Sequence, residues 1–311
     1  MHQPMRRRRR RFDDEYDEYD EQHHTGPRPD TRHEVTDAEP GAGDPDVPPD
    51  GDRWSTWTDV TAGQRGPRPW PGWLVTDAGA VDRELGVLKT GKEADVHLLE
   101  RGVPGSDRAV LLAAKRYRAL EHRMFHRDAG YLEGRRVRRS RETRAIANRT
   151  AFGRDVIAAQ WATAEFAVLS RLYEAGGSVP YPVQCTGAEL LMEFIGEPDG
   201  TAAPRLAQLR PGPDELCDLW HQLGDALGVL ADLGLAHGDL SAYNVLVHNG
   251  RLMLIDLPQV VDVIGNPQGA EYLARDVRRI GEWFVARGLP GGVGGPGQLL
   301  TELRRRARLG P

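Results

Sequence analysis

The feature that most constrains the fold is a short polar stretch, His237 to Asn244, which lies between a predicted helix and a predicted hairpin. Leucines recur on one face of the segment from residue 213 onwards, and Gly234 ends this helical pattern. Two short apolar runs follow within residues 244–256, separated by an Asn-Gly pair that is typical of a hairpin turn. A helix, a polar loop and a hairpin in this order predict a loop that is held firmly at both ends.

Three oxygen-bearing side chains, Asp239, Asn244 and Asp256, are distributed over this loop and the hairpin. Phosphoryl transfer requires an oriented acceptor hydroxyl and a metal ion that bridges the phosphates, and magnesium prefers oxygen ligands. We therefore expect Asp239 to orient or deprotonate a hydroxyl, and Asn244 and Asp256 to hold Mg²⁺, which Mn²⁺ could replace. Each residue alone would also suit a turn or a strand end, but their joint spacing favours an ATP-dependent phosphotransferase.

Lysine is scarce in this chain, which has 41 basic residues but only three lysines, Lys89, Lys92 and Lys115. Lysine is a compact point charge that fits beside a phosphate, whereas arginine is a wide planar fork. Lys115 ends an apolar strand, and Glu165 on a predicted helix is a candidate partner for it. Such a pair would place the lysine on the α- and β-phosphates of ATP, as in protein kinases. The alternative is a lysine that extends from a strand edge into solvent.

A turn with a glycine, formed by Thr90, Gly91, Lys92 and Glu93, is expected between two strands. A glycine lets backbone amides approach phosphate oxygens, while the threonine hydroxyl and the lysine charge could add contacts. The segment is neither a Walker loop nor G-x-G-x-x-G, and by itself it would equally suit an ordinary hairpin turn. Its position upstream of the three oxygen-bearing side chains favours a phosphate-binding role.

An apolar strand, residues 189–195, is expected to link two lobes of the molecule. Met192, Glu193 and Ile195 lie at its end, where the backbone could bind the edge of an adenine. From this segment alone, a plain buried strand is an equal alternative.

The fold class expected from this order of elements is α+β, with a β-rich lobe at about residues 80–195 and a helical lobe at about 196–290. Strands are predicted at 86–89, 96–99, 110–115, 189–195, 244–247 and 252–256, and helices at 155–174, from 213 to before Gly234, and at 275–287. A cleft between two lobes is a natural place for a ligand.

The first 53 residues are predicted to be a disordered, charged tail that precedes a domain at residues 54–311. An arginine run, Arg6 to Arg11, is followed by seven acidic residues within residues 13–21. Such a composition buries too little apolar surface to offset the entropy of ordering. We see no apolar run long enough to span a membrane and no secretory signal, and two cysteines suit a reducing cytoplasm. The arginine run could bind nucleic acid directly, but the neighbouring acidic residues weaken this interpretation, so the question stays open.

With these motifs in place, the chain resembles the RIO family of atypical protein kinases, specifically its type-1 branch. The resemblance covers roughly residues 80–290 and follows the family's order. It rests on Thr90 to Val96, Ala113 to Lys115, Tyr131 to Gly134, Trp161 to Tyr173, Met192 to Phe194, His237 to Asn244, Ile255 to Gln259, Asn266-Pro267 and Arg275-Asp276. Lys89 stands where the family commonly has serine, His97 replaces an aromatic residue, and Asn266 stands where histidine is usual.

The resemblance implies a protein-kinase-like fold, an ion pair between Lys115 and Glu165, and a catalytic Asp239. It also implies serine phosphorylation or an ATPase switch with autophosphorylation, and a flexible loop at residues 116–150. Some relatives serve ribosome maturation, so a ribosome-related partner is implied by resemblance only, and the acceptor protein is unknown.

Two other classes of function remain as alternatives. One is a small-molecule phosphotransferase of the aminoglycoside or choline kinase type, which shares His-Gly-Asp-Leu but usually lacks the Thr-Gly-Lys-Glu-Ala turn. The other is a nucleotide-gated scaffold that binds ATP with negligible turnover.

Overall fold

The computed structural model describes residue 48, residues 51–118 and residues 151–310, with only the backbone described for residues 151–155. The described residues all belong to one compact unit. The predicted disordered tail at 1–53 and the predicted flexible loop at 116–150 fall mainly outside the described residues, and so does the Tyr131 to Gly134 motif.

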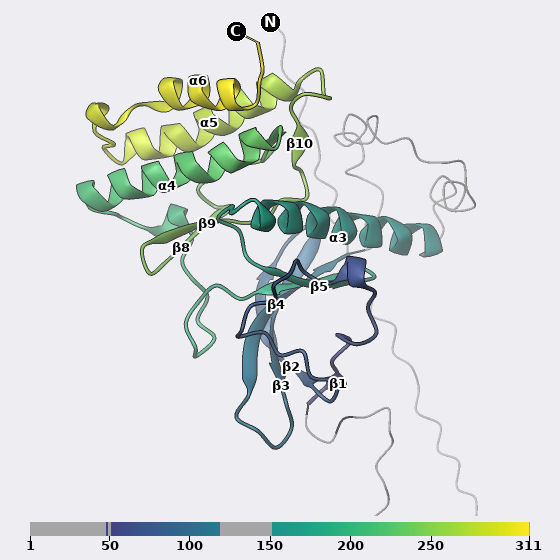
Figure 1. The fold of residues 1–311 in the computed structure, drawn as a ribbon. Helices are drawn as coiled ribbons and strands as arrows, with labels where there is room; N and C mark the ends of the chain where they lie inside the picture. The colour runs from purple at the N-terminus through teal and green to yellow at the C-terminus, as the bar shows by residue number, and fades with distance from the viewer. Residues whose placement is uncertain (1–47, 49–50, 119–150, 311) are drawn as a thin grey trace, which may run out of the picture. The chain divides into compact units, whose positions relative to one another are not determined.

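A six-stranded antiparallel sheet forms the first lobe (Figure 1). Its order is β1-β2-β3-β4-β6-β5, with β1 at Arg53–Trp54, β2 at Val81–Thr90, β3 at Ala94–Gly102, β4 at Ala109–Tyr117, β5 at Pro182–Thr186 and β6 at Glu189–Glu193. The strands predicted at 86–89, 96–99 and 110–115 lie within β2, β3 and β4. One face of the sheet is closed by apolar side chains that include Leu99, Leu112 and Leu191.

The segment that precedes β2 covers part of this sheet, although no strand was predicted there. Trp57 and Leu74 are buried in the same apolar cluster as Leu99. Strand β1 pairs with β2, while Arg65, just after the short helix η1 (Ala62–Gln64), forms an isolated antiparallel bridge with Gln184 of β5. The segment thus runs from the first strand of the sheet to its last.

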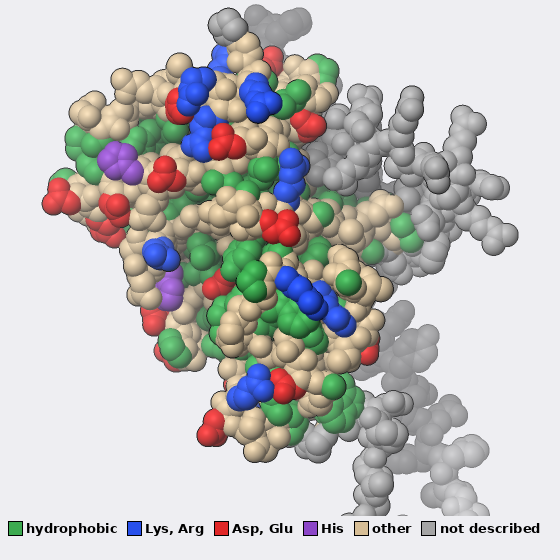
Figure 2. All heavy atoms as spheres, viewed as in Figure 1, with side chains coloured by type: hydrophobic (Ala, Val, Ile, Leu, Met, Phe, Trp, Pro, Cys, Tyr) green, Lys and Arg blue, Asp and Glu red, His purple; other side chains and the backbone are tan. Residues whose placement is uncertain are grey.

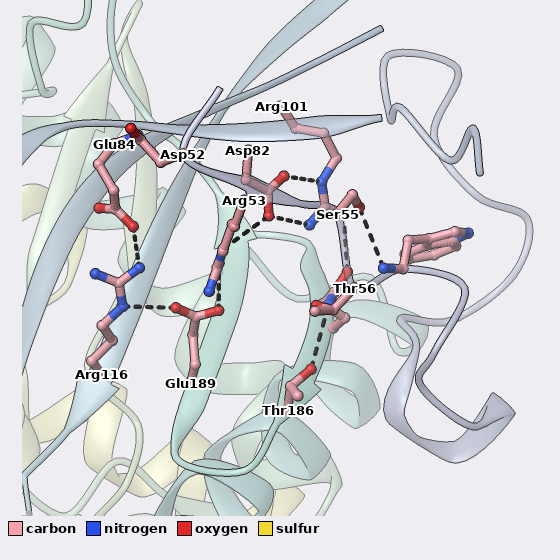
Figure 3. A network of polar contacts seen from close by, with 12 residues as sticks. Asp52, Arg53, Ser55, Thr56, Asp82, Glu84, Arg101, Arg116, Thr186 and Glu189 are labelled. Atoms are coloured by element: carbon pink, nitrogen blue, oxygen red, sulfur yellow. Dashed lines mark hydrogen bonds and ion pairs between the residues drawn. The ribbon is translucent and has the colours of Figure 1, made fainter. Parts of the chain in front are cut away.

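A buried polar network reinforces this arrangement (Figure 3). The guanidinium of Arg101 on β3 is fully buried and donates to both carboxylate oxygens of Asp82, at 2.7 and 3.0 Å. It also donates to the side-chain oxygen of Gln184 at 2.9 Å. Arg53 binds Glu189 at 2.7 Å, so strands that are not neighbours in the sheet are joined by side chains. These contacts across the sheet show that it is strongly curled.

The second lobe is mainly helical, and Figure 1 shows helix α3 crossing between it and the sheet. The helices are α3 (Ala151–Glu174), α4 (Pro213–Asp232), α5 (Gly269–Ala286) and α6 (Pro296–Arg306), with short η2 (Leu206–Gln208) and η3 (Gly291–Val293). Two small two-stranded sheets complete it, one from β7 (Leu235–Ala236) and β10 (Val261–Asp262) and one from β8 (Val245–His248) and β9 (Arg251–Leu254).

The α+β class and the two-lobed arrangement agree with the prediction, and the ends of several elements differ for local reasons. Strand β9 stops at Leu254 instead of 256, because the backbone of Asp256 turns into the left-handed region at φ 66°. Strand β6 stops at Glu193 instead of 195. The helix predicted at 275–287 begins earlier, at Gly269. Strand β5 and helix α6 were not predicted from the sequence.

Candidate functional site

The centre of the candidate site is Lys115, which points from β4 toward the second lobe. Its side chain is buried, and its Nζ lies 2.8 Å from a carboxylate oxygen of Glu165 and 2.8 Å from Oδ1 of Asp256. A buried ammonium is stable only when it is paired. Burial alone would lower the pKa of Lys115, but the two carboxylates outweigh this and hold the pKa above its usual value. Three residues that are distant in the sequence therefore meet at one nitrogen atom.

Glu165 is fixed by contacts on both lobes. It lies on α3 and is almost fully buried. Besides the Lys115 ammonium, it accepts a hydrogen bond from the Leu257 backbone N–H at 3.0 Å and one from the Tyr117 hydroxyl. Burial, followed by the nearby Glu165 carboxylate, raises the pKa of Tyr117, so that its hydroxyl stays protonated and donates. These bonds leave Glu165 little freedom to move away from Lys115.

Asp256 has an unusual backbone, since its φ of 66° is in a region that non-glycine residues rarely adopt. Such conformations often occur at functional sites, where surrounding contacts hold them in place. Burial alone would raise the pKa of Asp256, but the charge and hydrogen bond of Lys115 outweigh it and hold the pKa below its usual range. The carboxylate is therefore ionised at neutral pH, as a magnesium ligand must be.

We expect Asp256→Asn to reduce the pH dependence of stability. Because the pKa of Asp256 is lower in the folded state, its ion pair stabilises the protein above the unfolded pKa of about 3.9. That contribution is lost as the pH falls through the folded pKa. Urea unfolding at pH 7, 5, 4 and 3 should therefore show wild type and variant converging toward acid pH. The variant should fold, because asparagine tolerates positive φ and Lys115 remains paired with Glu165. A constant difference in unfolding free energy between wild type and variant at all four pH values would contradict the prediction.

The loop between β7 and β8 carries Asp239 and Asn244 side by side. The side-chain amide of Asn244 donates to the backbone carbonyl of Asp239 at 2.9 Å. The backbone carbonyl of Asn244 accepts from the Ile255 backbone N–H at 3.0 Å. Asn244 thereby connects the loop to the residue that precedes Asp256. The Asp239 carboxylate is about half exposed, with Arg279 of α5 at 2.9 Å from its Oδ1. The side chain proposed to meet an acceptor is thus open to solvent.

Helix α5 positions this loop through the side chain of Asp276. The buried carboxylate of Asp276 accepts from the backbone N–H of Gly238 at 2.7 Å and of Leu240 at 3.2 Å. Burial raises the pKa of Asp276, although the two amide donors oppose this. Buried His237 binds the Ile255 carbonyl through Nε2 at 3.1 Å, as expected of a bracing residue. Both residues flanking Asp239 therefore have their backbone fixed.

The turn formed by Thr90, Gly91, Lys92 and Glu93 joins β2 to β3. The Gly91 N–H donates to the Ala94 carbonyl at 3.0 Å, and a Cβ at Gly91 would lie 2.8 Å from that oxygen. Glycine is therefore required by the tightness of the turn itself. Thr90 and Lys92 are exposed.

The lobe connection contains Met192 and Glu193 at the end of β6 and Ile195 just after it. The Glu193 N–H donates to the Tyr181 carbonyl at 2.8 Å, and the Ile195 carbonyl accepts from the Ala203 N–H at 2.9 Å. These two backbone groups are therefore already occupied. An adenine edge would have to use other backbone groups of this connection.

Several contributors to the site were not singled out from the sequence. Tyr117 lies two residues after Lys115 on the same strand, which places both on one face. Arg279 lies three residues after Asp276, so it shares a helical face with it. These spacings could have identified them, whereas the Leu257 backbone donor left no sequence signal.

The described residues contain no group of three or more His, Cys, Asp or Glu side chains that could hold a metal by itself. Magnesium usually takes one or two carboxylates together with phosphates and water. Asp256 and the side-chain oxygen of Asn244 suit such a shared site. In the part of the chain that is described, no helix has both the length and the apolar character needed to cross a membrane.

The chain is similar to several known proteins. A family model described as the RIO domain matches residues 112–291, more than half of the chain. RIO-type serine/threonine-protein kinase Rio1 of Haloferax volcanii is 34% identical over 215 residues, covering 69% of this chain and 67% of that protein. Serine/threonine-protein kinase RIO1 of Caenorhabditis elegans is 34% identical over 133 residues, covering 42% of this chain and 26% of that protein. The chain thus spans about two thirds of the archaeal relative and a quarter of the nematode one.

Among solved structures, the Rio2 kinase-ADP/Mg²⁺-phosphoaspartate complex from Chaetomium thermophilum is similar, with a TM-score of 0.48 and 23% identity. The match covers 70% of this chain and 62% of that one. The family assignment itself rests on the domain match and on the archaeal relative. On these two findings, the chain belongs to the RIO family of atypical protein kinases.

Proposed function

We propose that this chain is an ATP- and magnesium-dependent serine/threonine protein kinase of the RIO type. The observation that carries the proposal is the meeting of Lys115, Glu165 and Asp256 at 2.8 Å across the two lobes. Kinases need a lysine held on the phosphates by a glutamate and an aspartate on the metal. This chain brings those three residue types together from β4, α3 and the end of the hairpin.

Each residue then has a role that follows from its chemistry. Lys115 binds the α- and β-phosphates, and Glu165 positions it. Asn244 and Asp256 would hold Mg²⁺, for which Mn²⁺ is a substitute, and the ion would supply positive charge beside the phosphates. Asp239 orients the acceptor hydroxyl, which its exposure permits. Thr90, Gly91, Lys92 and Glu93 approach the phosphates, and Met192, Glu193 and Ile195 line the adenine.

The family match does not favour the two alternatives, a small-molecule phosphotransferase and a scaffold with negligible turnover. The acceptor protein is unidentified, and a ribosome-related partner is proposed from family resemblance only. A cytoplasmic location is proposed because Cys185 and Cys217 are free thiols. On the face shown in Figure 2, basic and acidic side chains are interspersed, so this face offers no support for direct nucleic-acid binding.

The test is incubation of the full chain with γ-labelled ATP over a magnesium series. Wild type should transfer label to itself or to a protein acceptor, or release labelled phosphate, and EDTA should stop this. Asp256→Asn should need a higher magnesium concentration, because one anionic ligand is lost. Absence of both label transfer and phosphate release from wild type would contradict the proposal. Strong stimulation by aminoglycosides or choline would instead indicate a small-molecule acceptor.

A further inference from the structure

Lys89 occupies a place in the sheet that connects it to the proposed nucleotide site. In the strand pairing, Lys89 of β2 is opposite Val96 of β3, and Val96 is opposite Lys115 of β4. Residues directly opposite each other in an antiparallel sheet point to the same face. Lys89 and Lys115 therefore lie on one face, two strand spacings or about 10 Å apart. That face is the one from which Lys115 reaches Glu165 and Asp256.

The electrostatic surroundings of Lys89 agree with this placement. The pKa of its ammonium is lowered, mainly because neighbouring protein atoms displace part of its water, although the residue as a whole is exposed. The Asp256 carboxylate acts in the opposite direction, whereas Arg205 and Lys115 add to the lowering. Lys89 is thus within electrostatic range of both the proposed metal ligand and the proposed phosphate-binding lysine.

Lys89 differs from Lys115 in having no fixed partner. Lys115 is held by two carboxylates at 2.8 Å, whereas within the described residues no hydrogen bond or ion pair fixes the Lys89 ammonium. Arg205, its other cationic neighbour, donates to the backbone carbonyl of Tyr243 in the loop that carries Asp239. A cation without such a partner is available to a ligand that brings several negative charges.

We propose that Lys89 is a third cation of the nucleotide site, in addition to Lys92 and Lys115. It binds the phosphate chain of ATP from the β2 side, while Lys115 binds it from β4. This inference rests on the proposed function and goes beyond it, since it assigns a residue outside the Thr90–Glu93 turn. A triphosphate spreads its charge along a chain, so two lysines about 10 Å apart can each contact part of it. The site should then prefer nucleotides with longer phosphate chains.

The experiment compares binding of ATP, ADP and adenosine to the full chain by calorimetry in the presence of magnesium. Lys89→Met keeps the length of the side chain and removes its charge. It should weaken ATP binding about tenfold, as expected for one charge-assisted contact, weaken ADP less and leave adenosine unchanged. Lys89→Arg should keep most of the ATP affinity.

Arg83→Met is the matched control, because it removes a positive charge from the same strand at the end far from the site. Arg83 pairs with Glu100 on the surface, and its loss should leave all three affinities unchanged. Unchanged ATP binding by Lys89→Met, or an equal loss of adenosine binding, would overturn the inference. If wild type binds no ATP, the proposed function fails as well. If wild type binds ATP and Lys115→Met does not, the proposed function stands. In that case, unchanged ATP binding by Lys89→Met would refute only the role of Lys89.

Discussion

Asp239→Ala should lower the rate of phosphoryl transfer about 10²- to 10⁴-fold, the usual contribution of a positioned general base. Its affinity for ATP with magnesium should change little, because the proposed contacts to the nucleotide come from other residues. The loop should keep its shape, since Asp276 holds the backbone of Gly238 and Leu240, and Asn244 binds the main-chain carbonyl of residue 239. Single-turnover label transfer and calorimetric ATP binding measure the two quantities separately.

The chain provides a closely matched control in Asp232→Ala. Asp232 is also an aspartate with a half-exposed side chain paired to an arginine, Arg306, but it lies at the end of α4. Both substitutions remove a surface ion pair, which typically contributes less than about 1 kcal/mol to stability. Only the Asp239 variant should lose transfer. Equal rates for wild type and Asp239→Ala would show that another group positions the acceptor.

Arg101→Met should destabilise the protein by about 3–5 kcal/mol, because it leaves the Asp82 carboxylate buried without its main partner. Both side chains are fully buried, and three hydrogen bonds to Asp82 and Gln184 would be lost. Arg53, with its Nε 3.4 Å from Asp82, compensates only in part. Denaturant unfolding measures this difference in stability, provided that the unfolding free energy of both proteins depends equally steeply on denaturant concentration.

Two further variants isolate the buried pair. Arg83→Met removes a partly exposed arginine from the same sheet, and its pair with Glu100 should contribute less than about 1 kcal/mol. The double variant Arg101→Met with Asp82→Leu should recover much of the lost stability, since no charge is then left buried. A loss in Arg101→Met no greater than in Arg83→Met would mean that Asp82 finds another partner.

The local patterns of the chain predicted most of its helices and strands. Leucine spacing located α4, and its end before Gly234 agrees with the positive φ of 72° at that glycine. Short apolar runs separated by turns with glycine and proline located β2, β3 and β4, and the scarcity of lysine singled out Lys115. These features depend on residues close together in the sequence, so they can be read without the fold.

Features that depend on distant contacts could not be predicted in the same way. Residues 53–65 show no alternation of apolar and polar side chains. They are attached to the sheet by the buried side chain of Trp57 and by Arg53, which pairs with Asp82 and Glu189. The left-handed backbone of Asp256 likewise follows from its neighbours, since nothing in the residue type requires it. Similarly, the direct bond from Lys115 to Asp256 depends on how the lobes meet.

The course of residues 53–65 has a consequence for anyone who wishes to shorten this protein. Open sheet edges offer unpaired backbone groups to other molecules and promote edge-to-edge association. Here β1 covers part of the outer edge of β2, and the Arg65 bridge covers part of the outer edge of β5. A chain trimmed to begin near residue 80, just before β2, would expose both edges at once. Solubility, rather than the chemistry of the lysine and aspartate residues, would then limit its study.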